Sequence, residues 1–483
     1  MRFGGTWGTR GRGLATLALA GFLAACERPS PPPNFLLLSI DTLRADHLGS
    51  YGYPRDTSPN LDRFAAESVR YANAFAPAPW TLPSHVAMLA GRHPYGVGIV
   101  DTASSIPGDV ALLAEELSVA GYQTAAFVDS VSGGLLGAER GFSRGFDFYR
   151  HAPHDDASPY RYDMATTADV GLAWLTERDP ARPFFLFLHT KSVHTAPADP
   201  QLLARSDAPY QVPSREGGRF LEGGELRFPW RAGPEIAGVR YLQALNERIA
   251  AGRFDRLAFP RARLDELVGL YDAGIFYVDL QFAGLLQGLR ALGVEDDTVV
   301  IVTADHGEAF LDYLFFLHKE LRPPLLRVPL MVHDPERPAA VVAERVALAD
   351  IPTSVLERAG LAIPEGMTGR PLPTGPRASD PPRAFLSYYR FRERYFYEAY
   401  ALLDGPWKLV YQRLARAPDF RADLYDTRSD PEERSPVTDA PERTRAMLAR
   451  LKAWIAAPGE SRAERIELDA RTREELRVLG YLD

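Results

Sequence analysis

Residues 35–41 read Phe-Leu-Leu-Leu-Ser-Ile-Asp, and residues 299–306 read Val-Val-Ile-Val-Thr-Ala-Asp-His. Both stretches are short and almost wholly apolar until their last residues, which is typical of strands buried within a parallel sheet. Other short apolar runs alternate with helical patterns along the chain. This alternation predicts an α/β fold in which a large mixed, mostly parallel sheet is flanked by helices.

The same patterns predict the other elements. Strands are expected at residues 123–128, 184–188 and 328–332, and helices at 58–69, 110–121 and 264–292. Beyond residue 370 the apolar runs are short, at 407–411 and 424–425, and they stand among turns. We therefore expect a small C-terminal α+β subdomain over residues 371–483, built around an antiparallel sheet.

The domain before it is expected to span residues 34–370 and to carry catalysis. Within it, residues 196–263 are poorly patterned and rich in Gly, Pro and charge. Long segments of this kind are often functional loops. We expect this one to be a variable excursion over the active-site face rather than part of the core.

The N-terminus has the pattern of an export signal. Arg2, Arg10 and Arg12 precede an apolar stretch over residues 14–25, which ends in Leu-Ala-Ala before Cys26. This arrangement resembles a bacterial lipoprotein signal, so Cys26 is expected to be lipidated. Residues 27–33 hold four prolines and would form a stiff tether. The alternative is an ordinary secretory signal with a chance cysteine.

A lipidated Cys26 would anchor the protein to a membrane in a bacterial cell envelope, facing the periplasm or the exterior. Cys26 is also the only cysteine, so a disulfide within the chain is impossible. The 483 residues are 46% hydrophobic and 24% charged, which is enough for one large domain and a smaller one. The net charge of −8 argues against a nucleic-acid partner.

Three candidate metal ligands follow the two decisive strands. Asp41 ends the first apolar run, and Asp305 and His306 end the second. The carboxyl ends of strands are where open α/β sheets bind their ligands. Two carboxylates and an imidazole suit Ca²⁺, Mn²⁺ or Zn²⁺, and the nitrogen favours the last two.

A candidate nucleophile lies in Thr81-Leu82-Pro83-Ser84-His85. This segment leads into a helix through residues 86–90, whose first N–H groups would face an anion. A divalent ion beside Thr81 would lower the pKa of its hydroxyl and stabilise charge on a sulfuryl or phosphoryl group. The alternative is that Thr81 only caps the helix.

Taken together, these motifs resemble the sulfatase family of the alkaline phosphatase-like superfamily, over nearly the whole mature chain. The segments that carry the resemblance are residues 39–46, 81–85, 302–308, 327–330, 350–353, 359–360, 407–409 and 424–426. The resemblance implies an alkaline phosphatase-like sandwich and a hydrolase of sulfate or phosphate-type esters that uses one metal ion. Calcium is the commonest ion in that family.

The resemblance also implies residue roles. Asp41, Asp305 and His306 match metal ligands, and Thr81 matches the nucleophile, which also contacts the metal. His194 matches a catalytic histidine. Either His318 or Lys319 matches the cation that holds the anion. His85 and Arg92 would support the nucleophile, whereas we expect His189 and Lys191 to be solvated surface.

Four positions depart from the family pattern. Thr81 replaces Cys or Ser, and because threonine cannot become formylglycine, no formylglycine is expected. Thr42 replaces a second aspartate, and His85 replaces an arginine. A Lys-Trp-His segment that contacts sulfate has no match between residues 129 and 145. Threonine nucleophiles of this kind are similar to those of phosphotransferases and nucleotide pyrophosphatases of the same superfamily.

The sequence thus predicts a metal-dependent hydrolase of sulfate esters with a threonine nucleophile. Its partner would be an anionic ester, namely a sulfated or phosphorylated small molecule, glycan or lipid. One alternative is a phosphodiester or phosphonate hydrolase, or a phospho-group transferase. A second is a pseudoenzyme that binds sulfated or phosphorylated glycans without turnover.

Overall fold

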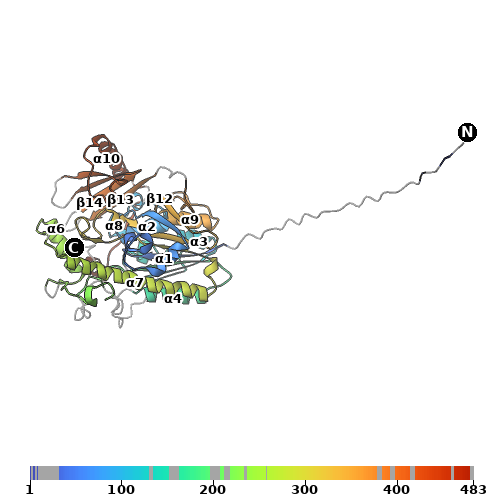
Figure 1. Ribbon diagram of the computed structural model, residues 1–483, viewed down its shortest axis with the longest axis horizontal. Coiled ribbons are helices and arrows are strands. Elements are labelled where there is room, and N and C mark those ends of the chain that lie inside the picture. The colour runs from blue at the N-terminus through green and yellow to red at the C-terminus, as the bar shows by residue number, and fades with distance from the viewer. Residues whose placement is uncertain are drawn as a thin grey trace. The chain divides into compact units, whose positions relative to one another are not determined.

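The first apolar run forms β1 (Asn34–Ile40), which lies within the main sheet of the computed structural model (Figure 1). The structure describes residues 1, 4, 5, 8, 32–129, 134–151, 163–195, 207–210, 218–232, 236–256, 258–377, 383–391, 397–413, 419–457, 459 and 462–478. Residues 33–483 form one compact unit. Cys26 and the apolar stretch before it lie outside the described residues.

Within the described residues the main sheet has nine strands. Its hydrogen-bonded order is β10 (Arg327–Val328), β2 (Val69–Phe75), β11 (Leu330–His333), β7 (Thr298–Thr303), β1, β6 (Phe184–Thr190), β4 (Gln123–Val128) and β5 (Phe148–His151), while β12 (Ala340–Ala347) pairs with β2. The run from β7 through β1, β6 and β4 to β5 is parallel. Both β10 and β11 are antiparallel to β2. The predicted mixed, mostly parallel sheet is therefore confirmed.

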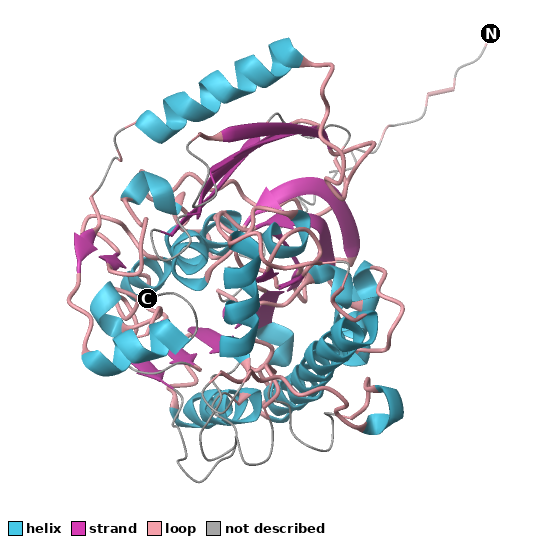
Figure 2. Ribbon diagram, turned by 90° about the vertical axis from the view of Figure 1, so that its left-hand side faces the viewer, coloured by secondary structure: helices cyan, strands magenta, loops and turns pink. Residues whose placement is uncertain are grey.

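Two groups of helices pack on the sheet (Figure 2). In the first, α1 (Pro59–Ala66) and α4 (Met164–Glu177) pack on the long α7 (Arg261–Ala291), and Figure 1 shows α4 and α7 side by side. In the second, α2 (Thr81–Ala90) and α3 (Leu113–Val119) pack on α9 (Asp350–Arg358). No described helix is long and apolar enough to cross a membrane.

A second sheet follows at the C-terminal end, as expected. Its four antiparallel strands are β13 (Ala384–Phe391), β14 (Tyr397–Asp404), β15 (Trp407–Arg413) and β16 (Arg421–Asp426). Helix α10 (Pro441–Ala456) packs on the last three strands. The domain boundary at residue 370 stays a prediction.

Short elements complete the fold. The remaining helices are α6 (Val239–Ala250), α8 (Pro323–Leu326) and α11 (Ala470–Val478), and the short strand pairs are β3 (Ser104–Ser105) with β17 (Glu464–Arg465) and β8 (Ala309–Phe310) with β9 (Phe316–Leu317). The 3₁₀ turns are Ala45–His47, Gly49–Tyr51, Pro94–Val97, Ala138–Arg140, Glu222–Gly224 and Glu295–Asp297.

Two expectations about the elements were wrong. The strand expected at residues 328–332 is broken into β10 and β11 at Pro329, because proline has no N–H to donate to a neighbouring strand. The segment 196–263 is also not entirely outside the core. Trp230 and the apolar face of α6, with Val239 and Leu242, are buried in the main hydrophobic cluster.

Candidate active site

Three strand ends meet at one edge of the main sheet. Strand β1 lies between β6 and β7 and runs parallel to both, so the residues after these strands emerge together. Asp41 follows β1 directly, and its N–H donates to the carbonyl of Thr190 at the end of β6, at 2.9 Å. Asp305 stands two residues after β7. Ligand sites of open α/β sheets lie at this edge.

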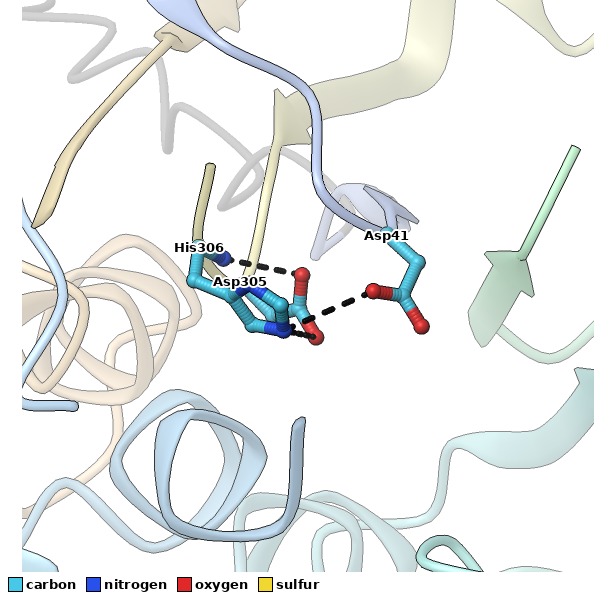
Figure 3. A group of neighbouring side chains, drawn as sticks. All are labelled: Asp41, Asp305 and His306. Atoms are coloured by element: carbon cyan, nitrogen blue, oxygen red, sulfur yellow. Dashed lines mark hydrogen bonds and ion pairs between the residues drawn. The ribbon is translucent and has the colours of Figure 1, made fainter. Parts of the chain in front are cut away.

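Asp41, Asp305 and His306 point toward one another (Figure 3). Nε2 of His306 is 3.5 Å from Oδ1 of Asp41 and 3.5 Å from Oδ2 of Asp305. One ligand atom from each residue lies within 4.8 Å of the other two, and all three side chains are fully buried. The structure therefore brings together the three residues that the sequence singled out as metal ligands.

Several polar atoms of this cluster lack hydrogen-bond partners, and a bound cation would take the place of those partners. Both carboxylate oxygens of Asp41, Oδ2 of Asp305 and Nε2 of His306 have no hydrogen-bond partner among the described residues. Buried polar atoms rarely lack partners. A divalent ion among them would satisfy these atoms, so the donor set fits a metal.

The pKa shifts of Asp41 and Asp305 also favour a bound cation. Burial and the nearby carboxylate of Asp41 raise the pKa of Asp305 well above its ordinary value. Burial also acts to raise the pKa of Asp41, but attraction to His194, His189 and His306 outweighs it and leaves that pKa well below its ordinary value. Two buried carboxylates this close resist ionising together unless a cation lies between them.

The backbone sets the orientation of His306. Its Nδ1 lies 2.9 Å from the carbonyl of Gly307, which makes Nδ1 the protonated nitrogen and leaves a lone pair on Nε2 facing the aspartates. Glycine is required at 307, because a Cβ there would lie 1.9 Å from the carbonyl oxygen of Pro324. The Asp-His-Gly segment is therefore shaped by a close approach to α8.

The loop after Asp41 is held by α7. Thr42 has a φ of 59°, which is unfavourable for a β-branched residue and marks a backbone that its surroundings constrain. Its N–H donates to Oδ1 of Asp305 at 3.2 Å. The buried hydroxyl of Tyr271 donates to the carbonyl of Thr42 at 2.7 Å and accepts from the N–H of Arg44 at 2.8 Å. Tyr271 thus fixes the loop that carries Asp41.

Thr81 is the first residue of α2 and is 1% exposed. His85, one turn later, is fully buried. Its Nδ1 lies 2.9 Å from the Thr81 carbonyl and 3.7 Å from Oδ2 of Asp305, and its Nε2 lies 3.0 Å from Oγ of Ser39. Burial and His189 hold the pKa of His85 well below its ordinary value. His85 therefore ties the start of α2 to β1 as a neutral group.

The rings of His318 and His194 continue outward from His306. The two rings have centroids 5.4 Å apart, and the ring of His318 is 5.0 Å from that of His306. Nδ1 of His194 is 2.6 Å from the carbonyl of Thr195. Burial lowers the pKa of His194 to about 4. The ring of His318 therefore lies against the candidate ligand His306, whereas Lys319 is half-buried.

The supporting residue Arg92 is half-buried, and its guanidinium lies against Gly366. The expectation of solvated surface for His189 and Lys191 was wrong, because these side chains are 0% and 4% exposed. Nε2 of His189 lies 3.6 Å from Oδ2 of Asp41. The sequence held a signal for this burial. The continuous apolar run of β6 predicts a strand buried on both faces, and residues at the end of such a strand are easily buried too.

Two buried carboxylates near the site were missed. Glu308 lies with Oε1 3.7 Å from Nδ1 of His318, and burial raises its pKa to about 7. Asp129 follows β4 and accepts from the N–H of Lys191 at 3.1 Å. Burial raises its pKa to about 7 as well. In the sequence, Asp129 is marked only by its position after a strand, and Glu308 only by its position after the Asp-His-Gly segment.

The fold and the motifs at this edge are those of a hydrolase that acts on ester bonds. The sulfatase family matches residues 33–361, and the family of N-sulphoglucosamine sulphohydrolase C-terminal regions matches residues 312–457. The chain belongs to the sulfatase family.

Individual relatives agree with this assignment. An N-acetylglucosamine-6-O-sulfatase of Bacteroides thetaiotaomicron is 23% identical over 484 residues, which cover 87% of this chain and 85% of the relative. A solved structure with the substrate D-glucosamine-2-N,6-O-disulfate has a TM-score of 0.65 at 19% identity, and covers 89% of this chain and 99% of its own. The phosphonate monoester hydrolase of Agrobacterium radiobacter has a TM-score of 0.64 at 20% identity, with 88% and 96% covered. At these identities the structural likeness shows the fold alone.

Proposed function

We propose that this protein hydrolyses sulfate esters with the hydroxyl of Thr81 as nucleophile and one divalent metal ion held by Asp41, Asp305 and His306. The observation that carries the proposal is the buried cluster of three ligands whose inward-facing atoms lack partners. A metal there would supply positive charge that stabilises the ester oxyanion and lowers the pKa of a neighbouring hydroxyl. Because a threonine stands at the nucleophile position, no formylglycine is involved.

Side chains of this protein would carry out the remaining steps of the reaction. The Thr81 hydroxyl would release its proton to water, and its oxygen would form a bond to sulfur as the in-line bond between sulfur and the ester oxygen breaks. Burial lowers the pKa of His194 to about 4, and the negative charge of a bound ester would raise it. The protonated ring, positioned by the contact of its Nδ1 with the Thr195 carbonyl, would then give a proton to that oxygen. His318 would hold the anion beside it. Water would then release sulfate from Thr81.

The proposal also concerns the class of substrate and the cellular location of the protein. The relatives named above include a sulfatase for N-acetylglucosamine and a protein solved with a disulfated glucosamine, which favours a sulfated glycan as substrate. The sequence before residue 27 supports a lipid anchor at Cys26 in a bacterial envelope. If Cys26 is lipidated, the Cys26→Ala variant should remain as unprocessed precursor. Soluble Cys26→Ala protein of normal processed size in the periplasm would rule the anchor out.

Phosphonate or phosphodiester hydrolysis is the second candidate. It is favoured by the threonine at position 81 and by the absence of a Lys-Trp-His segment. The phosphonate monoester hydrolase fold match is compatible with it. Retention of all three ligand residues argues against a pseudoenzyme.

A substrate panel separates the candidates. Metal-loaded protein should be assayed on aryl sulfates, phosphate diesters and phosphonates, first as wild type and then as His194→Ala. Sulfate ester turnover that is lost on chelation is the expected result. The variant should lose far more activity on alkyl esters than on nitrophenyl esters, because only poor leaving groups need a proton. Turnover of phosphonates but not of sulfates would replace the first candidate by the second.

A further inference from the structure

Asp41 presents its two carboxylate oxygens to two different histidines. Its Oδ1 faces Nε2 of His306 at 3.5 Å (Figure 3), and its Oδ2 lies 3.6 Å from Nε2 of His189. Neither oxygen has a hydrogen-bond partner in the described ranges of the chain. The cluster of Asp41, Asp305 and His306 therefore accounts for the surroundings of only one of the two oxygens.

His189 is held within the main sheet. It belongs to β6 and pairs in register with Ser39 of β1 and Val128 of β4. Its side chain is 0% exposed, and its ring packs edge-on against that of His85, with centroids 4.7 Å apart. Neither ring nitrogen has a hydrogen-bond partner among the residues that the structure describes, although buried polar atoms rarely lack one. The ring thus faces Asp41 with an unsatisfied nitrogen.

The spacing between His189 and Asp41 fits two ligands of one ion. A hydrogen bond from a ring N–H to an oxygen is about 2.7–3.2 Å long. Two ligand atoms bound tetrahedrally at about 2.1 Å to one ion lie about 3.4 Å apart. The 3.6 Å between His189 and Asp41 is closer to the second value, as are the 3.5 Å distances from Nε2 of His306 to Asp41 and Asp305.

His85 lies beside His189 but is not an equivalent candidate, because both of its ring nitrogens contact other groups. Nδ1 lies 2.9 Å from the Thr81 carbonyl, and Nε2 lies 3.0 Å from Oγ of Ser39. Of these two neighbouring histidines, His189 is therefore the one whose nitrogens are available to an ion.

We infer that His189 is a fourth ligand of the metal ion, which it binds through Nε2 from the Oδ2 side of Asp41. The inference rests on the proposed function only in that Asp41, Asp305 and His306 hold an ion. His189 is not among the three residues whose ligand atoms lie within 4.8 Å of one another, so the ion must draw its ring toward them.

A second imidazole changes the donor set of the site. Two nitrogens with two carboxylates favour Zn²⁺ over Ca²⁺, which prefers oxygen ligands. The competing explanation is that His189 donates a hydrogen bond to Asp41 and does not contact the ion. The two explanations differ in the number of imidazoles bound to the metal.

Pulsed EPR of the Cu²⁺-loaded full chain tests the inference, because the method counts the imidazoles bound to the ion. With one equivalent of Cu²⁺, the wild type should show two bound imidazoles. His189→Asn and His306→Asn should each show one. His93→Asn is the matched control and should show two, since His93 contacts the carbonyl of Leu386 at 3.0 Å, outside the cluster. His189→Gln replaces His189→Asn if that variant does not fold.

Metal preference supplies a second readout. The affinities for Zn²⁺ and Ca²⁺ should be measured by competition with a chelator in the wild type, His189→Asn and His93→Asn. Asparagine keeps an N–H group that can donate to Asp41 but offers an ion only its oxygen. Loss of the nitrogen ligand should lower the ratio of Zn²⁺ to Ca²⁺ affinity at least about 10-fold. A residue that only orients Asp41 would affect the two ions alike.

The inference is overturned if the wild type shows one bound imidazole, if two imidazoles persist in His189→Asn, or if the ratio of affinities does not change. Each of these results leaves the three-ligand site of the proposed function in place. Two imidazoles in the wild type and one in His189→Asn support the inference even if the protein hydrolyses no sulfate ester. The outcome for His189 is therefore distinguishable from that for the proposed function.

Discussion

Nε2 of His306 lies 3.5 Å from Oδ1 of Asp41, and neither atom has a hydrogen-bond partner within the described part of the chain. Two potential ligand atoms thus face the same small volume from the ends of two adjacent strands. Their backbones are anchored separately, Asp41 by Thr190 and His306 by Oδ1 of Asp305 at 2.8 Å. The site is therefore preorganised for a cation.

Replacing Asp305 tests this arrangement. Asp305→Ala removes one ligand, so bound metal should fall below detection by elemental analysis, and added divalent ions should no longer raise the melting temperature. Asp279→Asn is a matched control, because Asp279 is a buried carboxylate that caps α1 through the N–H of Leu61 at 2.7 Å. That variant should lose stability but keep its metal. Full metal occupancy in Asp305→Ala would show that the ion binds elsewhere.

Substitutions of Thr81 test whether its hydroxyl is the nucleophile. Thr81→Ser keeps the hydroxyl oxygen and should keep much of the turnover, whereas Thr81→Ala should have none. Thr81→Val keeps the branched shape without the oxygen, so it separates chemistry from packing and should also be inactive. Activity should not depend on whether the expression host can make formylglycine. Wild-type turnover by Thr81→Val would assign the attack to water or to another residue.

Tyr271 should matter for metal affinity although it is not a ligand. Tyr271→Phe leaves the carbonyl of Thr42 and the N–H of Arg44 without their partner and releases the loop that carries Asp41. Loss of a group that positions ligands typically weakens metal binding about 10- to 100-fold.

Tyr51→Phe provides the control for Tyr271. The Tyr51 hydroxyl likewise bridges two backbone groups, with the N–H of Leu330 at 2.9 Å and the carbonyl of Tyr71 at 3.1 Å, but it does not bond the metal-ligand loop. Both variants should melt earlier than wild type. Equal metal affinity in the two variants would reduce Tyr271 to a purely structural residue.

Acid stability should depend on His93, which lies outside the site. Burial lowers its pKa to about 4, and its Nε2 lies 3.0 Å from the carbonyl of Leu386. Between pH 6.5 and 4 the unfolded chain binds a proton there that the folded chain does not, so the free energy of unfolding must fall as pH falls.

Urea denaturation of His93→Gln at pH 7 and pH 4.5 measures this effect. The acid-induced loss should be smaller in the variant by up to about 3 kcal/mol. His333→Gln is the control, since His333 also contacts a backbone carbonyl, that of Glu67 at 3.0 Å. An unchanged pH dependence in His93→Gln would mean that His93 is already protonated in the native protein.

Much of the sheet could be predicted from local pattern. The strand expected at 123–128 matches β4 residue for residue, because a continuous apolar run between turn residues leaves little choice. Strands β13 and β14 were not predicted. Their apolar residues are interrupted by Ser387, Arg390 and Glu398, so a search for continuous apolar runs overlooks them.

The sequence by itself determined the chemical identity of the site: two aspartates and a histidine after apolar strands, a threonine at the start of a helix, and the Gly307 that lets the chain pass close to α8. It could also associate them with a family, since those motifs occur in a recognisable order.

Only the tertiary structure decided which other polar residues belong to the site. His189, Lys191 and Asp129 lie at or just after the ends of apolar runs in the sequence, but only the structure shows that they are buried beside Asp41 or each other. The reason is geometric. Parallel strands deliver their carboxyl ends to one edge whatever their separation along the chain, and burial there depends on neighbours that local sequence does not reveal.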